Sequence, residues 1–219
     1  MSDGHEPAKA VTAKRRGKVI ITGTGRAGTT LLVRILTRLG LDTQFTEADL
    51  AAVEQEVGRA GLEKIINAKR AARLPEIVKS PHLTELLETA LAQGWFTVDH
   101  AIVPVRALAD AARSRARVTE RARTLKKETQ NVNGGLWDVT DPDAQEAELA
   151  RKFHSLVETL VKHQIPTTFL SFPRFATDAD YLADVLGDFL SMRFGVTREQ
   201  ILAAHAREAR PALIGEAAP

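Results

Sequence analysis

Residues 18–40 read KVIITGTGRAGTTLLVRILTRLG, and this stretch decides how the rest of the chain is interpreted. Residues 19–22 are apolar or β-branched without a break, which predicts a short buried strand. A glycine-rich turn follows at 23–28. Leucine and isoleucine then recur at helical spacing up to Gly40, which stands where helices commonly end. The order strand, glycine turn, helix predicts a phosphate cradle, because the backbone can approach an anion at a helix N-terminus.

The turn differs from the Walker A pattern, since Thr29 stands where that pattern has lysine. Arg26 supplies a cation inside the turn instead. The pattern G-x-x-R-x-G-T-T-L-L resembles the 5′-phosphosulfate loop of sulfotransferases that use 3′-phosphoadenosine 5′-phosphosulfate (PAPS). The alternative is an ordinary turn between strand and helix. The resemblance implies that the following residues bind the cofactor: Gly23, Thr24, Gly25, Arg26, Ala27, Gly28, Thr29 and Thr30.

A second constellation follows the predicted strand at 98–105. Arg106 stands at the end of this strand, and Ser114 comes eight residues later. The pair resembles the 3′-phosphate site of PAPS-dependent sulfotransferases. A guanidinium can bind a phosphate through two hydrogen bonds, and a serine hydroxyl adds a further donor. The alternative is that Arg106 caps a sheet edge and that Ser114 is merely exposed.

Three residues are candidates for the chemical step beside Arg26. Lys79, at the end of a short predicted strand, opens a Lys-Ser-Pro segment that resembles one near the transferred sulfonate in several branches of that family. Strand ends of this kind bind ligands in open α/β sheets. His82 is a candidate base, because its pKa suits proton removal near neutrality. Glu47 is another, since some branches carry a glutamate in this region. Both are also common at helix N-termini, and Thr46 can cap a helix that includes Glu47.

A basic series surrounds and follows Ser114, and a solvated helix face is the preferred interpretation for most of its members. Its members could instead attract a polyanionic cofactor or an acidic acceptor. The best-known branches of the family carry a late Arg-Lys-Gly segment on the 3′-phosphate, which this chain lacks; Arg207, Arg210 or the series itself are possible substitutes. Trp137 could stack on adenine or an acceptor, or pin its loop to the core. The series comprises Arg113, Arg115, Arg117, Arg121, Arg123, Lys126 and Lys127.

Strands and helices alternate along the chain, which predicts a parallel sheet covered on both faces. Strands are expected at 19–22, 77–78, 98–105 and 167–172, and helices at 29–39, 47–72, 83–93, 107–127, 143–164, 178–190 and 198–207. The helix over 47–72 could be broken at Gly58 or Gly61. The resemblance implies a three-layer P-loop, sulfotransferase-like α/β fold with a central, mostly parallel sheet flanked by helices. We expect a single domain over 18–208, a disordered basic tail over 1–17 and a loose tail over 209–219.

The composition narrows the classes of function. The 219 residues are 44% hydrophobic and 26% charged, which is typical of a globular domain with a core. A net charge of only +2 gives little reason to expect a nucleic acid partner. Cysteine is absent and the histidines are scattered, so no metal site is expected. No apolar run predicts a membrane span or a secretory signal, and a bacterial cytoplasmic setting is expected.

The resemblance implies a sulfotransferase that transfers a sulfonate group from PAPS to a hydroxyl or amine of a small-molecule or carbohydrate acceptor. Arg26 and Lys79 would offset the developing negative charge. Two alternatives stay open: a P-loop kinase of a small molecule, and a catalytically inactive protein that kept the anion cradle. The acceptor and the oligomeric state are not predicted.

Overall fold

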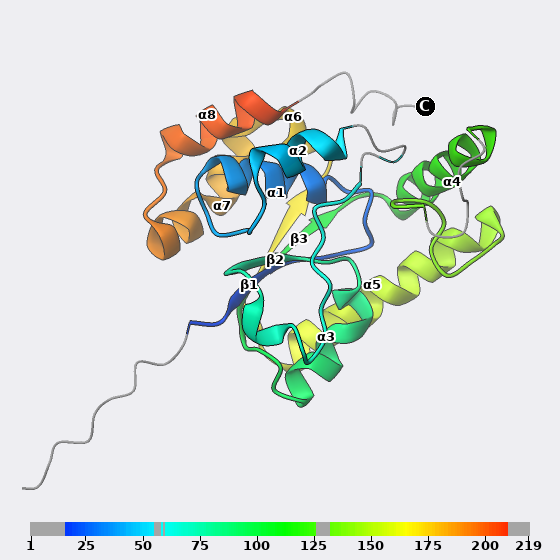
Figure 1. Cartoon of the computed structure of the whole chain (residues 1–219), viewed down its shortest axis with the longest axis horizontal. Coiled ribbons are helices and arrows are strands. Elements are labelled where there is room, and N and C mark those ends of the chain that lie inside the picture. Colours follow the sequence, from blue (N-terminus) through cyan, green and yellow to red (C-terminus); the bar gives the residue numbers. More distant parts are fainter. Residues whose placement is uncertain (1–15, 55–57, 59, 126–131, 210–219) are drawn as a thin grey trace, which may run out of the picture.

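The computed structural model describes residues 16–54, 58, 60–125 and 132–209, and these form an α/β fold around one sheet. The sheet has four strands in the order β2-β1-β3-β4, and every neighbouring pair is parallel (Figure 1). The predicted α/β fold with a parallel sheet flanked by helices is therefore confirmed. The strands are β1 (Lys18–Ile21), β2 (Ile77–Lys79), β3 (Val98–Val105) and β4 (Thr167–Ser171).

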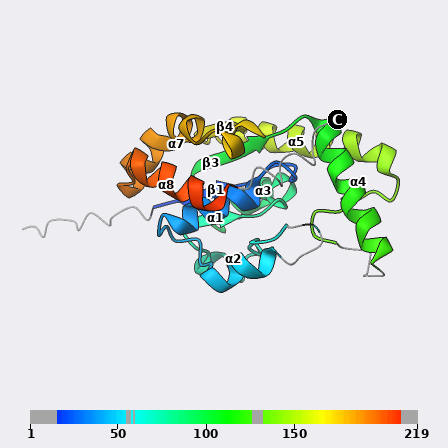
Figure 2. The ribbon, with the colours of Figure 1, turned by 90° about the horizontal axis from the view of Figure 1, so that it is seen from above.

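Helices cover both faces of the sheet, so the molecule has three layers. The helices are α1 (Thr29–Arg38), α2 (Glu47–Val53), α3 (Leu83–Ala92), α4 (Leu108–Thr124), α5 (Gln145–Lys162), α6 (Arg174–Thr177), α7 (Ala179–Phe194) and α8 (Arg198–Glu208), with short 3₁₀ turns at Ala71–Arg73 and Pro142–Ala144. Helix α4 lies at one end of the molecule, and α7 and α8 lie at the other (Figure 2).

The alternation of side chains along β1 explains the layers. Val19 and Ile21 pack into a core with α1, α7 and α8, while Ile20 packs into a second core with α3 and α5. All three side chains are buried, as expected for a strand with both faces covered. Continuous apolar residues in a strand therefore predicted a buried central strand correctly.

The order in which the chain forms its strands places a topological switch point next to the glycine turn. The chain leaves β1, adds β2 on one side, and then crosses to add β3 on the other side of β1. The carboxyl ends of β1 and β3 therefore flank a topological switch point, which is where open α/β sheets bind ligands. The turn after β1 and Arg106 after β3 both lie at this point.

The expected helix over 47–72 is the clearest error of the sequence interpretation. Helix α2 ends at Val53, and the described residues between 58 and 70 contain no helix. Gly61 and Leu62 both have positive φ, 147° and 54°, which interrupts a right-handed helix. Thr46 caps α2 as predicted, in a capping box with Asp49. Within the described ranges, every helix is too short or too polar to cross a lipid bilayer.

Candidate functional site

The glycine loop, which we define as Gly23–Gly28, has the backbone of an anion cradle. Gly25, Arg26 and Gly28 have φ of 71°, 55° and 78°, so three of the last four residues before α1 have positive φ. The N–H groups of residues 25–30 donate no hydrogen bond to any described residue. Backbone donors in such a turn, together with the first turn of a helix, favour a bound anion.

The two constellations that the sequence singled out meet at this loop. Arg26 donates from Nε to Ser114 Oγ at 3.0 Å and from Nη1 to the Gly58 carbonyl oxygen at 2.6 Å. Arg106 donates from Nη1 to the carbonyl oxygen of Arg26 at 3.0 Å, and its guanidinium lies 5.2 Å from the centre of the Phe172 ring. Residues 80 and 88 positions apart in the sequence therefore form one connected polar group.

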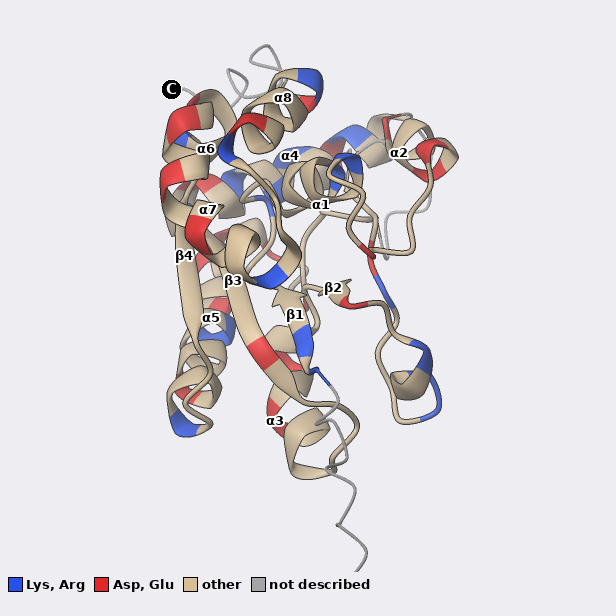
Figure 3. Ribbon diagram, turned by 90° about the vertical axis from the view of Figure 1, so that its left-hand side faces the viewer, with Lys and Arg blue, Asp and Glu red and all other residues tan. Residues whose placement is uncertain are grey.

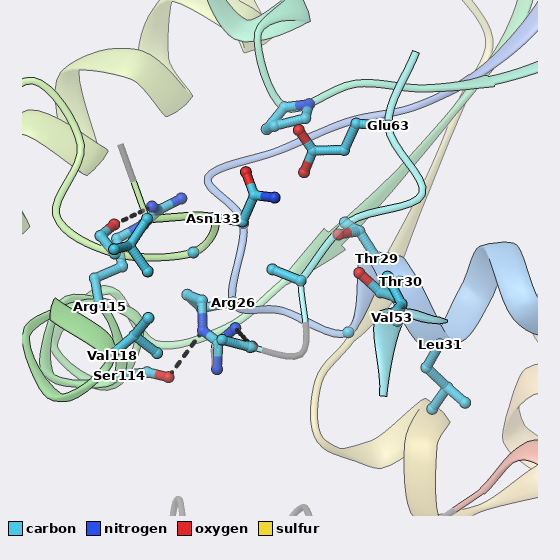
Figure 4. A pocket seen from close by; sticks show the side chains of 18 of the residues that line it. Arg26, Thr29, Thr30, Leu31, Val53, Glu63, Ser114, Arg115, Val118 and Asn133 are labelled. Atoms are coloured by element: carbon cyan, nitrogen blue, oxygen red, sulfur yellow. Dashed lines mark hydrogen bonds between the residues drawn. The ribbon is translucent and has the colours of Figure 1, made fainter. Parts of the chain in front are cut away.

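A cavity of about 770 Å³ opens over this group (Figure 4). Figure 4 shows Arg26 between Ser114 and Val118 on the side of α4 and Thr29 and Thr30 on the side of α1. The volume is within the range of small-molecule sites. The predicted site residues that line the cavity are Gly25, Arg26, Gly28, Thr29, Thr30, Lys79, His82, Arg106 and Ser114.

The other predicted site residues lie outside the cavity lining. Thr24 and Ala27 are buried in the glycine loop, and Gly23 lies with them at its beginning. Glu47, which was predicted as a catalytic base, is not among the residues that line the cavity. Its side chain is 73% exposed at the start of α2, where it pairs with Arg38. Glu47 therefore acts as a first-turn acid of the capped helix in this structure.

Positive charge dominates the side of the cavity that α4 forms. Helix α4 carries Arg113, Arg115, Arg117, Arg121 and Arg123; Figure 3 marks the lysine and arginine positions of the ribbon in blue. Five lining arginines make no ion pair with a described carboxylate; they are Arg26, Arg106, Arg115, Arg117 and Arg121. The lining acids are paired instead: Glu63 with Lys79, and Glu54 and Glu208 with Arg34. The cavity thus presents net positive charge to a ligand.

Burial and mutual repulsion both weaken proton binding by these arginines. Burial, then the charges of Arg106 and Arg117, lower the pKa of Arg26 to about 10. Burial, then the charge of Arg26, lowers the pKa of Arg115 to about 10. Burial also lowers the pKa of Arg106. These arginines stay cationic at neutral pH, and an anion in the cavity would relieve their repulsion.

Lys79 and His82, two of the predicted catalytic residues, also line the cavity. Lys79 is buried, and its Nζ donates to the Gly61 carbonyl oxygen at 2.6 Å and to Glu63 Oε1 at 2.9 Å. His82 packs edge-on against Trp137, with ring centres 5.7 Å apart. Glu63 was missed by the sequence interpretation, because it lies in the irregular segment that follows the left-handed Leu62.

Trp137 pins its loop to the core, which was one of the two roles expected of it. It is 9% exposed, and its backbone N–H and carbonyl both bond to the Gln145 side chain. Arg115 and Lys152 lie 5.0 and 4.4 Å from its ring centre. Lys152 in turn holds Glu85, Asp138 and Glu148, the described carboxylates whose spacing would suit a metal ion.

The basic series around Ser114 does not form a single solvent-exposed helix face. Arg115 is 6% exposed, and Arg117 and Arg121 line the cavity, whereas Arg113 and Arg123 are exposed and pair with acids of their own helix. The spacing from Ser114 to Arg117 and Arg121 is three and seven residues, which places all three on one face. That spacing was the signal available in the sequence. Lys126, Lys127 and Arg210 lie outside the described residues.

Comparison of the chain with protein-family models, curated proteins and solved structures returned no match.

Proposed function

We propose that this protein is a PAPS-dependent sulfotransferase. The observation that carries the proposal is the meeting of the glycine loop, Arg26, Arg106 and Ser114 in one cavity that is rich in unpaired cations. A cofactor with a phosphosulfate at one position and a phosphate at another needs two anion sites within one molecule's length. The free amides at residues 25–30 suit the first, and the Arg106–Ser114 pair suits the second.

The residues divide into binding and reacting groups under this proposal. The loop amides and Arg26 bind the 5′-phosphosulfate, and Arg106 and Ser114 bind the 3′-phosphate. PAPS supplies a sulfonate group for transfer. Arg26 and Lys79 offset negative charge that develops at the reacting group. His82 or Glu63, which both line the cavity, accepts the proton of the acceptor's hydroxyl or amine.

The strand ends favour this function over a magnesium-dependent kinase. Such kinases hold the metal with an acidic side chain near the phosphates. The two strands that flank β1 have basic residues at their carboxyl ends instead. Strand β2 ends in Lys79, and Arg106 follows directly after β3. We further propose a bacterial cytoplasmic enzyme with a small-molecule or carbohydrate acceptor.

Calorimetric titration with adenosine 3′,5′-bisphosphate, beside ATP with magnesium, tests the proposal. We expect the bisphosphate to bind, and Arg106→Ala to weaken its binding roughly ten- to hundred-fold, the cost of a lost charge-assisted hydrogen bond. Arg123→Ala is the control, since Arg123 is exposed on α4, the helix that follows Arg106, and pairs with Glu120. Binding of ATP alone would refute the sulfotransferase.

A transfer assay separates the enzyme from an inactive binding protein. The purified protein is incubated with PAPS labelled in the sulfonate group and a panel of alcohols, amines and saccharides, and labelled products are separated by chromatography. An enzyme transfers label to at least one acceptor class, and Arg26→Ala removes that transfer. A protein that binds the bisphosphate tightly and transfers label to none of these acceptors fits the inactive alternative.

A further inference from the structure

Arg115 connects the glycine loop to the segment that crosses over the cavity. It follows Ser114 on α4 but is 6% exposed. Its Nη2 donates to the Thr24 carbonyl oxygen at 2.7 Å, and its Nη1 donates to the Gly135 carbonyl oxygen at 2.6 Å. Its Nε is buried without a hydrogen-bond partner among the described residues. A buried cation with one unsatisfied donor costs folding free energy, so its position calls for a reason other than stability.

The hydrogen bond to Thr24 fixes the direction of an amide that faces the proposed anion site. In a planar trans peptide, the carbonyl of one residue and the N–H of the next point in opposite directions. Arg115 holds the Thr24 carbonyl, so the N–H of Gly25 points away from the guanidinium. Arg106 holds the Arg26 carbonyl in the same way, which turns the N–H of Ala27. Two arginines therefore hold alternate carbonyls of the glycine loop and leave alternate amides free to donate.

The close approach of Arg115 also accounts for the glycine at position 25. A Cβ on Gly25 would lie 2.5 Å from Arg115 Nη2, closer than any real contact allows. Gly25 also has φ 71°, which a side chain disfavours. The guanidinium of Arg115 can therefore approach the loop backbone this closely only because residue 25 has no side chain.

The second arm of Arg115 reaches the cover segment, which we define as residues 132–138. Six of its residues line the cavity. Gly134 lies close to Arg26, since a Cβ there would be 2.9 Å from Arg26 Nη1. Trp137 stacks on Arg115 from the same segment, and Thr119 of α4 accepts the Leu136 N–H at 2.9 Å. A single side chain therefore links the loop below the cavity with the segment above it.

We infer that Arg115 is a positioning residue, which holds the glycine loop in its anion-binding form and ties the cover segment to it. This inference rests on the proposed function for the identity of the anion, a 3′,5′-phosphorylated nucleotide. It assigns Arg115 a geometric role: two different nitrogens of one guanidinium hold two carbonyls from separate segments. Lysine carries the same charge but lacks this planar fork, so its one nitrogen does not replace both donors at these positions.

The experiment compares Arg115→Lys and Arg115→Met with Arg123→Lys and Arg123→Met as controls. Affinity for adenosine 3′,5′-bisphosphate is measured by calorimetry, and folding is checked by urea unfolding. We expect Arg115→Lys to lose roughly ten-fold or more in affinity although the charge is kept, as befits a lost charge-assisted hydrogen bond. The two Arg123 variants keep the affinity of the unmodified protein. Unchanged affinity in Arg115→Lys overturns the inference, because charge alone would then be sufficient.

A spectroscopic readout separates positioning from stability. The amide resonances of Gly25 and Ala27 are followed in ¹H–¹⁵N spectra during titration with inorganic pyrophosphate. We expect pyrophosphate to shift the Gly25 amide strongly in the unmodified protein and weakly in Arg115→Lys, while Ala27 keeps most of its shift because Arg106 is intact. Equal Gly25 shifts in the two proteins overturn the inference.

The two proposals fail in different ways. An unmodified protein that binds pyrophosphate through Gly25 but does not bind the bisphosphate refutes the sulfotransferase, and a weaker Gly25 shift in Arg115→Lys then still supports the role of Arg115. An unmodified protein that binds both probes, with Arg115→Lys binding them equally well, refutes only the role of Arg115. If the unmodified protein binds neither pyrophosphate nor the bisphosphate, the sulfotransferase and the role of Arg115 are both refuted.

Discussion

Two groups of arginines lie on opposite sides of the cavity, and they are satisfied in different ways. The paired cluster, on the side of α1 and α8, joins Arg34 and Arg38 to Glu208, with Glu54 and Glu47 as second partners. The cavity cluster, on the side of α4, comprises Arg26, Arg106, Arg115 and Arg117. Where its hydrogen bonds are described, they go to carbonyl oxygens and to a serine hydroxyl.

The difference separates arginines that stabilise the fold from arginines that are available to a ligand. Carboxylates cancel the charge of the paired cluster, so it gains little from a further anion. Carbonyl and hydroxyl oxygens fix the position of the cavity cluster without cancelling its charge. The lowered pKa values of Arg26 and Arg115 are the consequence: burial comes first, repulsion from neighbouring arginines adds to it, and for Arg115 the charges of Glu63 and Asp138 offset the two only in part.

The largest expected effect is on stability and comes from the paired cluster. Glu208 is 2% exposed and bonds to both Arg34 and Arg38. We expect Glu208→Ala to lower the free energy of unfolding by about 3 kcal/mol, the lower end of the cost of breaking a buried pair, because each arginine keeps a second carboxylate. Urea unfolding measures the loss. A change as small as that of Arg198→Ala, which breaks only exposed pairs with Asp180 and Asp184, would contradict the assignment.

The same carboxylate predicts a pH dependence of stability. Burial acts to raise the pKa of Glu208, but its hydrogen bonds with Arg38 and Arg34 outweigh burial and hold the pKa below its ordinary value of 4.5. Because the pKa is lower in the folded state, the stabilisation is complete above pH 4.5 and is lost as the pH falls through the folded-state value. Glu208→Gln therefore flattens the fall in stability below pH 4.5. An equally steep fall in the variant would assign it to other carboxylates.

The next effect is on binding and comes from the cavity cluster. Arg117 lines the cavity, and its charge contributes to the lowered pKa of Arg26 and of Arg106. We expect Arg117→Ala to weaken binding of adenosine 3′,5′-bisphosphate roughly ten-fold, with a smaller effect on adenosine 5′-monophosphate. Calorimetry at two salt concentrations measures both, and the variant shows the weaker salt dependence. Arg123→Ala is the control, and an equal loss there would show that only the charge of α4 matters.

The sequence predicted the fold because its signals are local. The continuous apolar residues of β1 and β3, the glycine turn and the following helix each specify their own backbone. The Arg106–Ser114 pair was selected from its resemblance to a family pattern, after a strand whose end the sequence marks clearly. The predicted helix over 47–72 was wrong beyond Val53: Gly61 was recognised as a place where it could break, but the sequence does not report the positive φ of Leu62.

The rest of the site depends on contacts between distant segments. Arg115 is buried because the glycine loop and residues 135–137 close around α4, and neither is near it in the sequence. Glu63 reaches the cavity through an irregular segment that Lys79 holds. Glu47 was selected for its position after α1, but α2 turns it toward Arg38. Residue type and spacing therefore identified the cradle, whereas tertiary packing decides which cations and acids surround it.

The smallest effect distinguishes backbone strain from the fit between the loop and the cavity cluster. Gly25 and Gly40 have nearly equal φ, 71° and 75°, but a Cβ on Gly40 would meet nothing within 4 Å. We expect Gly40→Ala to lower the free energy of unfolding by about 1 kcal/mol, the cost of a side chain in the left-handed region, and Gly25→Ala to lower it by at least as much, because its Cβ also displaces Arg115.

Only Gly25→Ala should also weaken bisphosphate binding, because its Cβ displaces Arg115 from the Thr24 carbonyl. The comparison holds the backbone strain constant and changes only what surrounds it. Equal binding by the two variants would mean that the loop keeps its amides in place without Arg115, and that the cavity cluster contributes charge to the site but not shape.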